Sequence, residues 1–256
     1  MTSSTSQKLF SQLRVLKSKY GLEGIKAEFE AEGSSFNDVA RLRVILSKLN
    51  IKMFVKIGGV EAINDIYNCL ELGVDGIIAP MVETKFGVKK FIDVFKKLKL
   101  KKNPHLSINI ETKTGVSNLS EILKLSAEKI DNITIGRTDL SSSYFKSTIK
   151  PNSQFILKKI ENISKVAKKY GVTTTVGGSV NFETIKIYSK IKNMKSLVNR
   201  METRKVILPT KIFLKRKNAL SAALKFEELY ILYKKEMTDL RISSEISRLS
   251  ILKTRK

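Results

Sequence analysis

The sequence predicts an α/β fold: a (β/α)8 barrel of the TIM type, in which seven strands can be recognised, with a C-terminal helical extension. Short apolar runs alternate with amphipathic helical stretches along most of the chain, a pattern typical of a parallel sheet covered by helices. Charged residues alternate with apolar ones inside several of these runs, so each such strand has one polar side. We expect the barrel to span residues 1–211 and the extension residues 212–256.

The elements are predicted in chain order from this pattern. A stripe of Leu9, Leu13 and Leu16 indicates a helix over 5–20, which Gly21 ends. Strands are expected at 24–31, 53–58, 76–82, 106–111, 132–137, 172–176 and 205–208. Helices are expected between them at roughly 37–49, 60–72, 85–99, 118–129, 153–170 and 181–193. A closed barrel needs eight strands, and the missing one is either hidden in the N-terminal segment or absent.

The C-terminal extension is helical in pattern and contains no predicted strand. Its apolar side is formed by Leu224, Leu229, Leu232, Met237 and Leu240. Such a side must be covered, so we expect the extension to pack on the barrel or on a partner subunit.

The chain is strongly basic, with 48 Lys and Arg against 24 Asp and Glu and a formal net charge of +24. Either a basic patch binds nucleic acid, or the lysines line solvated helix faces. The second interpretation is favoured because lysines recur with apolar residues at helical spacing, as in KKFIDVFKKLKLKK. A positive field attracts small anionic substrates, so we expect an anionic small molecule as the partner rather than nucleic acid.

Three features bear on the compartment in which the protein works. Cys69 is the only cysteine, so an internal disulfide is impossible, which fits a reducing compartment. No run of 18 or more uninterrupted apolar residues occurs, and the segment MTSSTSQKLF lacks an apolar signal core. We therefore expect a cytoplasmic protein that does not associate with a membrane.

Polar side chains alternate with apolar ones in three of the predicted strands. Lys26, Glu28 and Glu30 share one side of the first strand. Lys56 alternates with apolar residues on the second strand, as do Asn109 and Glu111 on a later one. Unpaired charges cannot lie beneath a coat of helices, so these groups are expected to point into a polar barrel mouth, where barrel enzymes have their active sites. The alternative is a set of buried ion pairs.

Three segments resemble a known family. INIETKTGVSNLSEI (108–122) resembles the metal-binding signature of the HpcH/HpaI aldolase and citrate lyase family. ITIGRTDLSSSY (133–144) resembles the family's second signature, and LGVDGIIAPMVET (72–84) resembles the strand that carries Pro-Met-Val-Glu. The order and spacing also match. The resemblance covers about residues 24–182 and fades beyond them.

The resemblance implies that Glu111 and Asp139 bind Mg²⁺ or Mn²⁺. Hard divalent cations prefer oxygen ligands, and two carboxylates leave positions at which an oxo-acid can chelate. The cation would then stabilise an enolate as a Lewis acid. The resemblance also implies that Gly136, Arg137 and Thr138 position the substrate carboxylate, with Arg137 adding positive charge. The alternative makes Glu111 and Asp139 caps or members of ion pairs without a metal.

Two departures from the family affect the predicted chemistry. The aldolase branch has a histidine for proton transfer on an early strand, where this chain has Ala31. Glu28 or Glu30 is therefore the expected general base, with a pKa raised by burial, whereas His105 is expected at the surface. An arginine that steadies the enolate in the family is replaced by Lys56, which keeps the charge but loses the bidentate fork.

These inferences predict a metal-dependent carbon–carbon lyase or aldolase. It would act on a pyruvate-like oxo-acid or an acyl-CoA through a metal-stabilised enolate, and by resemblance it would be a homo-oligomer. The alternative is a non-catalytic basic binding protein for an anionic ligand or nucleic acid on a barrel scaffold, an interpretation to which the missing histidine, the lysine at position 56 and the net charge lend some support.

Overall fold

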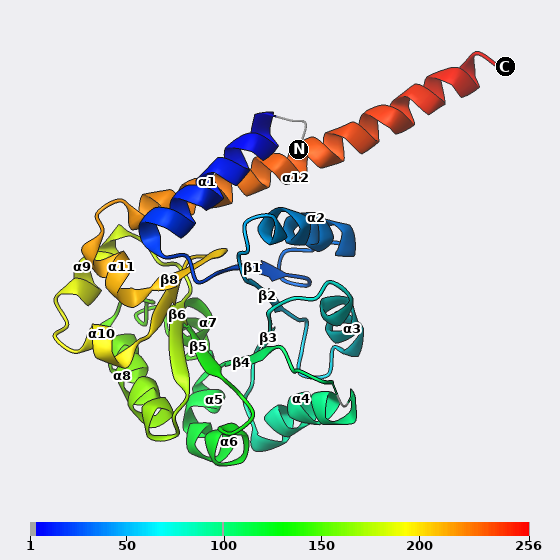
Figure 1. Ribbon diagram of the computed structural model, residues 1–256. Helices are drawn as coiled ribbons and strands as arrows, with labels where there is room; N and C mark the ends of the chain where they lie inside the picture. The colour runs from blue at the N-terminus through cyan, green and yellow to red at the C-terminus, as the bar shows by residue number, and fades with distance from the viewer. Residues whose placement is uncertain (1–3, 99, 256) are drawn as a thin grey trace.

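The computed structural model describes residues 4–98 and 100–255. The predicted fold class is confirmed: eight strands close into a barrel surrounded by helices, and a long helix follows the barrel (Figure 1). The strands are β1 (Gly24–Glu28), β2 (Met53–Lys56), β3 (Gly76–Ala79), β4 (His105–Asn109), β5 (Asn132–Gly136), β6 (Thr173–Gly177), β7 (Arg200–Glu202) and β8 (Val206–Pro209).

Helices follow most of the strands and cover the outside of the barrel (Figure 1). Those of the barrel are α2 (Phe36–Ser47), α3 (Ile63–Glu71), α4 (Lys85–Leu98), α5 (Lys113–Ser117), α6 (Leu119–Ser126), α7 (Arg137–Ser142), α8 (Gln154–Lys169), α9 (Phe182–Ser189), α10 (Met194–Leu197) and α11 (Thr210–Lys215). The N-terminal helix α1 (Ser4–Tyr20) lies alongside the first half of α12 (Ala219–Lys253), whose second half projects away from the barrel (Figure 1).

The expectation of a parallel sheet is wrong at one strand. β1 to β7 pair in parallel in chain order, whereas β8 runs antiparallel to both β7 and β1. The strand that the sequence pattern missed is β7, and the N-terminal segment forms helix α1 instead. Only residues 203–205 join β7 to β8, and a parallel crossover needs a dozen residues or more, so the chain can only turn back as a hairpin.

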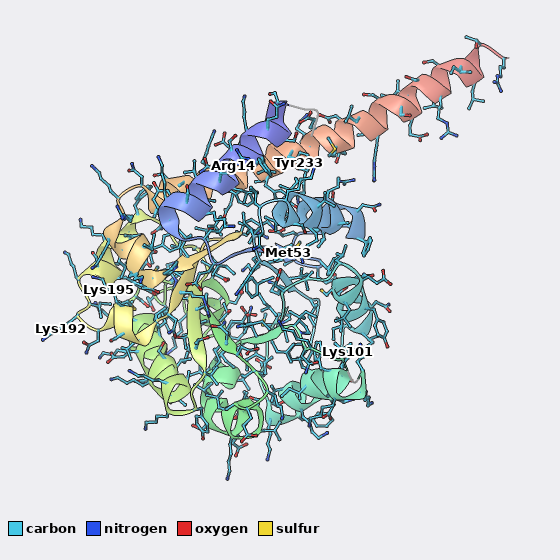
Figure 2. The ribbon with its side chains drawn as sticks, in the orientation of Figure 1. Arg14, Met53, Lys101, Lys192, Lys195 and Tyr233 are labelled. Atoms are coloured by element: carbon cyan, nitrogen blue, oxygen red, sulfur yellow. The ribbon has the colours of Figure 1, made fainter. Side chains whose placement is uncertain are left out.

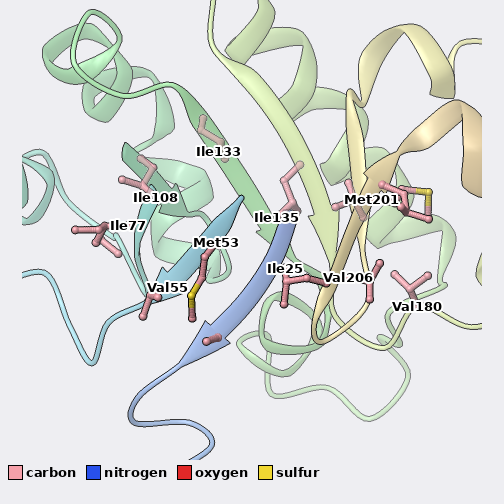
Figure 3. Close-up of a cluster of buried hydrophobic side chains, with 14 of the residues drawn as sticks. Ile25, Met53, Val55, Ile77, Ile108, Ile133, Ile135, Val180, Met201 and Val206 are labelled. Atoms are coloured by element: carbon pink, nitrogen blue, oxygen red, sulfur yellow. The ribbon is translucent and has the colours of Figure 1, made fainter. Parts of the chain in front are cut away.

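The strands present two chemically different faces. Their apolar residues, including Ile25, Val55 and Ile133, form one buried cluster with the apolar sides of the helices (Figure 3). The alternate residues face the barrel axis and include Lys26, Ser107, Asn109, Asn132, Thr134, Thr175 and Glu202, all buried. Barrel interiors are usually filled by branched apolar side chains, so a polar interior indicates that this one holds more than a packed core.

Basic side chains are spread over the outer surface. Lys101, Lys192 and Lys195, for example, lie at the periphery of the molecule (Figure 2). Within the described residues, no helix combines the length and the apolar character that a membrane span requires.

Candidate metal centre and active site

Glu111 lies two residues beyond the end of β4, at the end of the barrel where the parallel strands finish. Its carboxyl group is buried and accepts hydrogen bonds from the backbone N–H of Met81 (3.0 Å) and from the Asn109 side-chain amide (3.1 Å). Burial raises the pKa of this carboxyl, although the Met81 hydrogen bond opposes the rise. A nearby cation would stabilise the ionised form of a carboxylate held in this way.

Gly136, at the end of β5, provides the space that Glu111 occupies. A Cβ atom on this glycine would lie 2.3 Å from Oε2 of Glu111, well inside van der Waals contact. Met81 has a positive φ of 51°, which is strained for a non-glycine residue. Its backbone N–H donates the hydrogen bond that the Glu111 carboxyl group accepts. Two backbone constraints from neighbouring strand ends thus fix the position of Glu111.

Asp139 is the third residue of α7, the short helix that begins directly after β5. Its side chain is exposed, and it raises the pKa of Glu111 because the two negative charges lie close enough to repel. In the described part of the chain, neither carboxylate forms an ion pair with a lysine or arginine. Glu111 and Asp139 thus follow the ends of the neighbouring strands β4 and β5, at the same end of the barrel, and their role as metal ligands stays a prediction.

This donor set fits a hard divalent cation. The two carboxylates repel each other, and a shared cation would relieve that repulsion. The side-chain oxygen of Asn109, beside Glu111, is buried without a hydrogen-bond partner among the described residues. No group of three or more His, Cys, Asp or Glu side chains with metal-binding geometry occurs there either, so the remaining ligands would be water or substrate oxygens, as is usual for Mg²⁺.

Lys56, the last residue of β2, lies beside this pair of carboxylates. Its ammonium group is 3.1 Å from Oε2 of Glu28, and its charge lowers the pKa of Glu111. Glu28 in turn lies 3.4 Å from Lys26, which pairs with Glu202 at 2.6 Å. These four side chains form a continuous chain of ion pairs across the barrel, which we call the interior ion-pair chain.

The expectation that burial raises the pKa of Glu28 is wrong. Burial acts in that direction, but the charges of Lys26 and Lys56 outweigh it, so the pKa of Glu28 lies below its usual value. A carboxylate with a lowered pKa is a weak base, and this one is enclosed by two lysines. The alternative of buried ion pairs thus describes Glu28 correctly, whereas Glu30 is exposed and packs against Gly58 beyond the end of β2.

Arg137 does not face a substrate. Its side chain is fully buried (0% exposed) and donates to the carbonyl oxygens of Gly177 (3.1 Å) and Gly178 (2.5 Å). It also donates to Asn152 (2.7 Å), and its guanidinium group lies 5.6 Å from the ring centroid of Tyr188. This corrects the expectation that Arg137 adds charge beside the substrate, because its donors are used to join α7 to the loop after β6.

The backbone around Thr138 packs tightly against the same loop. The Thr138 hydroxyl is 2.9 Å from that of Ser179. A Cβ atom on Gly178 would lie 2.7 Å from the backbone nitrogen of Thr138, so only glycine allows this approach. Gly136 and Thr138 therefore lie at the mouth of the barrel near Glu111 and Asp139, while Arg137 holds the loop after β6, and a role of Gly136 and Thr138 in substrate binding stays a prediction.

The sequence reasoning missed two members of the site. Glu202, which neutralises Lys26, lies on the short β7 that was not recognised; the alternation of Arg200, Met201 and Glu202 is the signal that could have found it. The role of the Met81 backbone has no sequence signal. His105 is a correction too: it is partly buried on β4, edge-on to the ring of Phe54, rather than at the surface.

Comparison with known proteins now places the chain in a family. Residues 42–186, more than half of the chain, match the model of the HpcH/HpaI aldolase/citrate lyase family. The chain belongs to the HpcH/HpaI aldolase/citrate lyase family. It is thus a member of a family of aldolases and lyases, and the three segments that suggested the resemblance all lie within the matched region.

Solved structures share the fold at low sequence identity. A family protein from Burkholderia cenocepacia J2315 has 10% identity and a TM-score of 0.62, and the match covers 92% of this chain and 90% of that one. The citrate synthase SbnG has 18% identity and a TM-score of 0.57, over 71% and 76% of the two chains. The protein CitE from Mycobacterium tuberculosis, solved with magnesium and acetate, has 13% identity and a TM-score of 0.54, over 87% and 93%. A search of curated proteins gave no match.

Proposed function

We propose that this protein is a divalent-metal-dependent carbon–carbon lyase or aldolase that forms or quenches the enolate of a pyruvate-like oxo-acid or an acyl-CoA. The observation that carries the proposal is the pair formed by Glu111 and Asp139: two carboxylates from neighbouring strand ends, close enough to repel and without a cationic partner among the described residues. Family membership supports the reaction class.

Glu111 and Asp139 would hold Mg²⁺ or Mn²⁺ at the mouth of the barrel. The cation, when bound, supplies Lewis-acid stabilisation for negative charge on substrate oxygen atoms. Glu111 is already oriented by Met81 and Asn109, so binding costs little reorganisation. Gly136 and Thr138 line the same mouth and would position the substrate carboxylate.

Lys56 would stabilise negative charge that develops on the substrate. Its ammonium group already lies between carboxylates of β1 and of the end of β4, and Glu28 holds it in place. Glu28 is therefore a positioning residue in this proposal. The role of the proton-transfer group is assigned to Glu30 instead. Glu30 is exposed at the same end of the barrel and is not enclosed by the lysines that surround Glu28.

Exchange of the methyl protons of pyruvate in D₂O tests the proposal without knowledge of the second substrate. We expect the protein with Mg²⁺ or Mn²⁺ to accelerate the loss of the pyruvate methyl signal in proton NMR, because an enolate takes up deuterium from solvent. Glu111→Gln should abolish the acceleration, whereas Glu121→Gln, at an exposed position on α6, should not. Equal exchange with and without the protein would rule out an enolate formed from pyruvate, and full exchange by Glu111→Gln would refute the role of the metal pair.

The net positive charge supports a second candidate function, that of an anion-binding protein on the same scaffold. That protein would bind nucleic acid with an affinity that falls steeply with salt and does not change in Glu111→Gln. A filter-binding titration at two salt concentrations separates the two classes.

A further inference from the structure

A cavity of about 370 Å³ opens at the end of the barrel opposite the candidate metal centre. It is bordered by residues at the starts of the parallel strands, among them Phe54, His105, Asn132 and Arg200. Glu28, Lys56 and Glu111 do not line it. Its volume lies in the lower part of the range of small-molecule sites, which is roughly 300–1,000 Å³. Nothing in the proposed reaction uses this space.

The cavity has an apolar wall and a hydroxyl-bearing wall. Phe54, Ile78 and Ile207 contribute apolar surface, and Gly24 and Gly76 leave room for the Phe54 ring, since a Cβ atom on either would lie 2.4 Å from it. The facing polar wall is formed by Ser107, Asn132, Thr134 and Thr175, which hydrogen-bond to one another. This network holds the hydroxyl groups in fixed positions, as a preformed site requires.

The two acidic residues that line the cavity are each paired with a basic residue, whereas two lysines at its rim are not paired with an acidic residue. Glu23 pairs with Arg200, and Glu202 pairs with Lys26 of the interior ion-pair chain. Lys17 and Lys52 border the cavity as exposed side chains, and neither forms an ion pair among the described residues. An anionic group would therefore be favoured at the rim and an uncharged chain further in.

His105 adds a polar group that lacks a partner. Its imidazole borders the cavity, and its Nδ1 atom is buried without a hydrogen-bond partner among the described residues. Burial lowers the pKa of this histidine, and Arg200 and Lys52 lower it further against the opposing charge of Asp131, which favours the neutral ring.

We propose that this cavity is a second binding site, for a hydroxylated aliphatic carboxylic acid. The aliphatic chain would lie along Phe54, Ile78 and Ile207, and the hydroxyl group would face the Ser107 and Thr175 side. The carboxylate would lie at the rim beside Lys17 and Lys52. The interior ion-pair chain separates this site from the metal centre, so the site binds its ligand without a metal.

Binding of 3-hydroxyhexanoate tests the proposal, measured by isothermal titration calorimetry on the whole chain in the presence of EDTA. EDTA removes any metal-dependent binding at Glu111 and Asp139, so failure here is distinguishable from failure of the proposed lyase. We expect saturable millimolar binding. Ile78→Phe, which fills the cavity with apolar volume, should abolish it, and the far-UV circular dichroism of that variant checks its fold.

The rim is tested separately by a substitution at Lys52, an exposed position at which we expect no effect on folding. Lys52→Ala should weaken binding of 3-hydroxyhexanoate about three-fold, the size expected for one exposed charge pair. Binding of the neutral analogue hexane-1,3-diol should not change in this variant. Lys124→Ala, at an exposed lysine on α6 that does not line the cavity, should bind both probes as the parent chain does.

Three results would overturn the proposal. They are the absence of saturable binding to the parent chain, unchanged binding to a folded Ile78→Phe variant, and equal affinity of the parent and Lys52→Ala for the carboxylate. The first means that the cavity holds only water, and the second places the ligand elsewhere on the protein.

Discussion

Glu28 holds two lysines inside the barrel, and only 5% of its side chain is exposed. Lys26 has a second carboxylate partner in Glu202, whereas Lys56 has no other ion-pair partner among the described residues. Removal of the Glu28 charge therefore leaves Lys56, whose side chain is only 18% exposed, without an ion-pair partner among the described residues. We therefore expect removal of this charge to lower the free energy of unfolding by a large amount that depends on pH.

Glu28→Gln is predicted to lower the free energy of unfolding at pH 7 by about 3 kcal/mol, the usual cost of breaking a buried ion pair. Because folding lowers the pKa of Glu28, the stabilisation is present above the ordinary glutamate pKa and is lost as the pH falls through the lowered value. The difference between parent and variant should therefore shrink in acid. Urea denaturation at a series of pH values measures it.

Glu121→Gln, at an exposed position, is the matched control and should unfold as the parent chain does at every pH. A difference between parent and Glu28→Gln that is constant with pH would contradict the account of Glu28.

At the scale of residues, the position of Glu111 at a strand end was open to prediction, whereas the direction of the pKa shift of Glu28 was not. Glu111 is recognisable because it stands in a motif. The pKa of Glu28 depends on Lys56 from the neighbouring strand, which the register places directly opposite. Alternation within one strand predicts which side chains share a face, but register decides which charges pair.

At the scale of elements, the end of β5 determines where Glu111 can lie. Gly136→Ala is predicted to weaken Mn²⁺ binding about ten-fold or more, because the new Cβ atom would displace the Glu111 carboxylate. Gly59→Ala is the control, since a Cβ atom there meets nothing within 4 Å. Titration calorimetry with Mn²⁺ compares the two, and equal affinities would show that Gly136 has no part in the site.

Arg137 joins α7 to the loop after β6 and is predicted to act on stability rather than on substrate binding. Arg137→Met should lower the free energy of unfolding by about 2–4 kcal/mol, because the carbonyls of Gly177 and Gly178 lose their buried donor. The folded Arg137→Met variant should keep the Mn²⁺ affinity of the parent chain. Unchanged stability in urea together with a raised KM for the oxo-acid would instead support a role in substrate binding.

The elements were predictable where the chain alternates long helices with strands of four or five residues. β7 was missed because it has three residues, and no apolar run marks it. The direction of β8 followed from the length of its connection, a constraint that becomes informative only once both strands are known.

At the scale of the whole molecule, α12 has two distinct halves. Its buried residues end at Tyr230, and residues 238–255 are all exposed, including Leu240, Ile246 and Leu249. The prediction that the extension packs on the barrel or a partner subunit describes only the first half, which lies against α1. The apolar groups of the second half have no cover within one copy of the described chain.

Truncation after Arg241 is predicted to change the Tm of the monomer by no more than about 2 °C, because it removes exposed side chains only. Phe226→Ala, in the buried half, should lower the free energy of unfolding by about 3 kcal/mol. Differential scanning calorimetry at two protein concentrations measures both. A larger drop in Tm on truncation, dependent on concentration, would show that the projecting half packs against another copy.

The barrel and its polar mouth could be predicted from the sequence because both rest on local patterns and on motifs, whereas metal binding by Glu111 and Asp139 stays a prediction. The cavity at the opposite end could not, because its walls come from seven of the eight strands and from the segments before them. Its volume depends on how large and small side chains meet across the barrel.

The central claim is that Glu111 and Asp139 share one divalent cation, and Mn²⁺ binding followed by electron paramagnetic resonance tests it most directly. The account predicts one site per chain in the parent and in Glu121→Gln. It predicts loss of that site in both Glu111→Gln and Asp139→Asn. Retention of the site in either of these two variants, or its absence from the parent chain, would contradict the account.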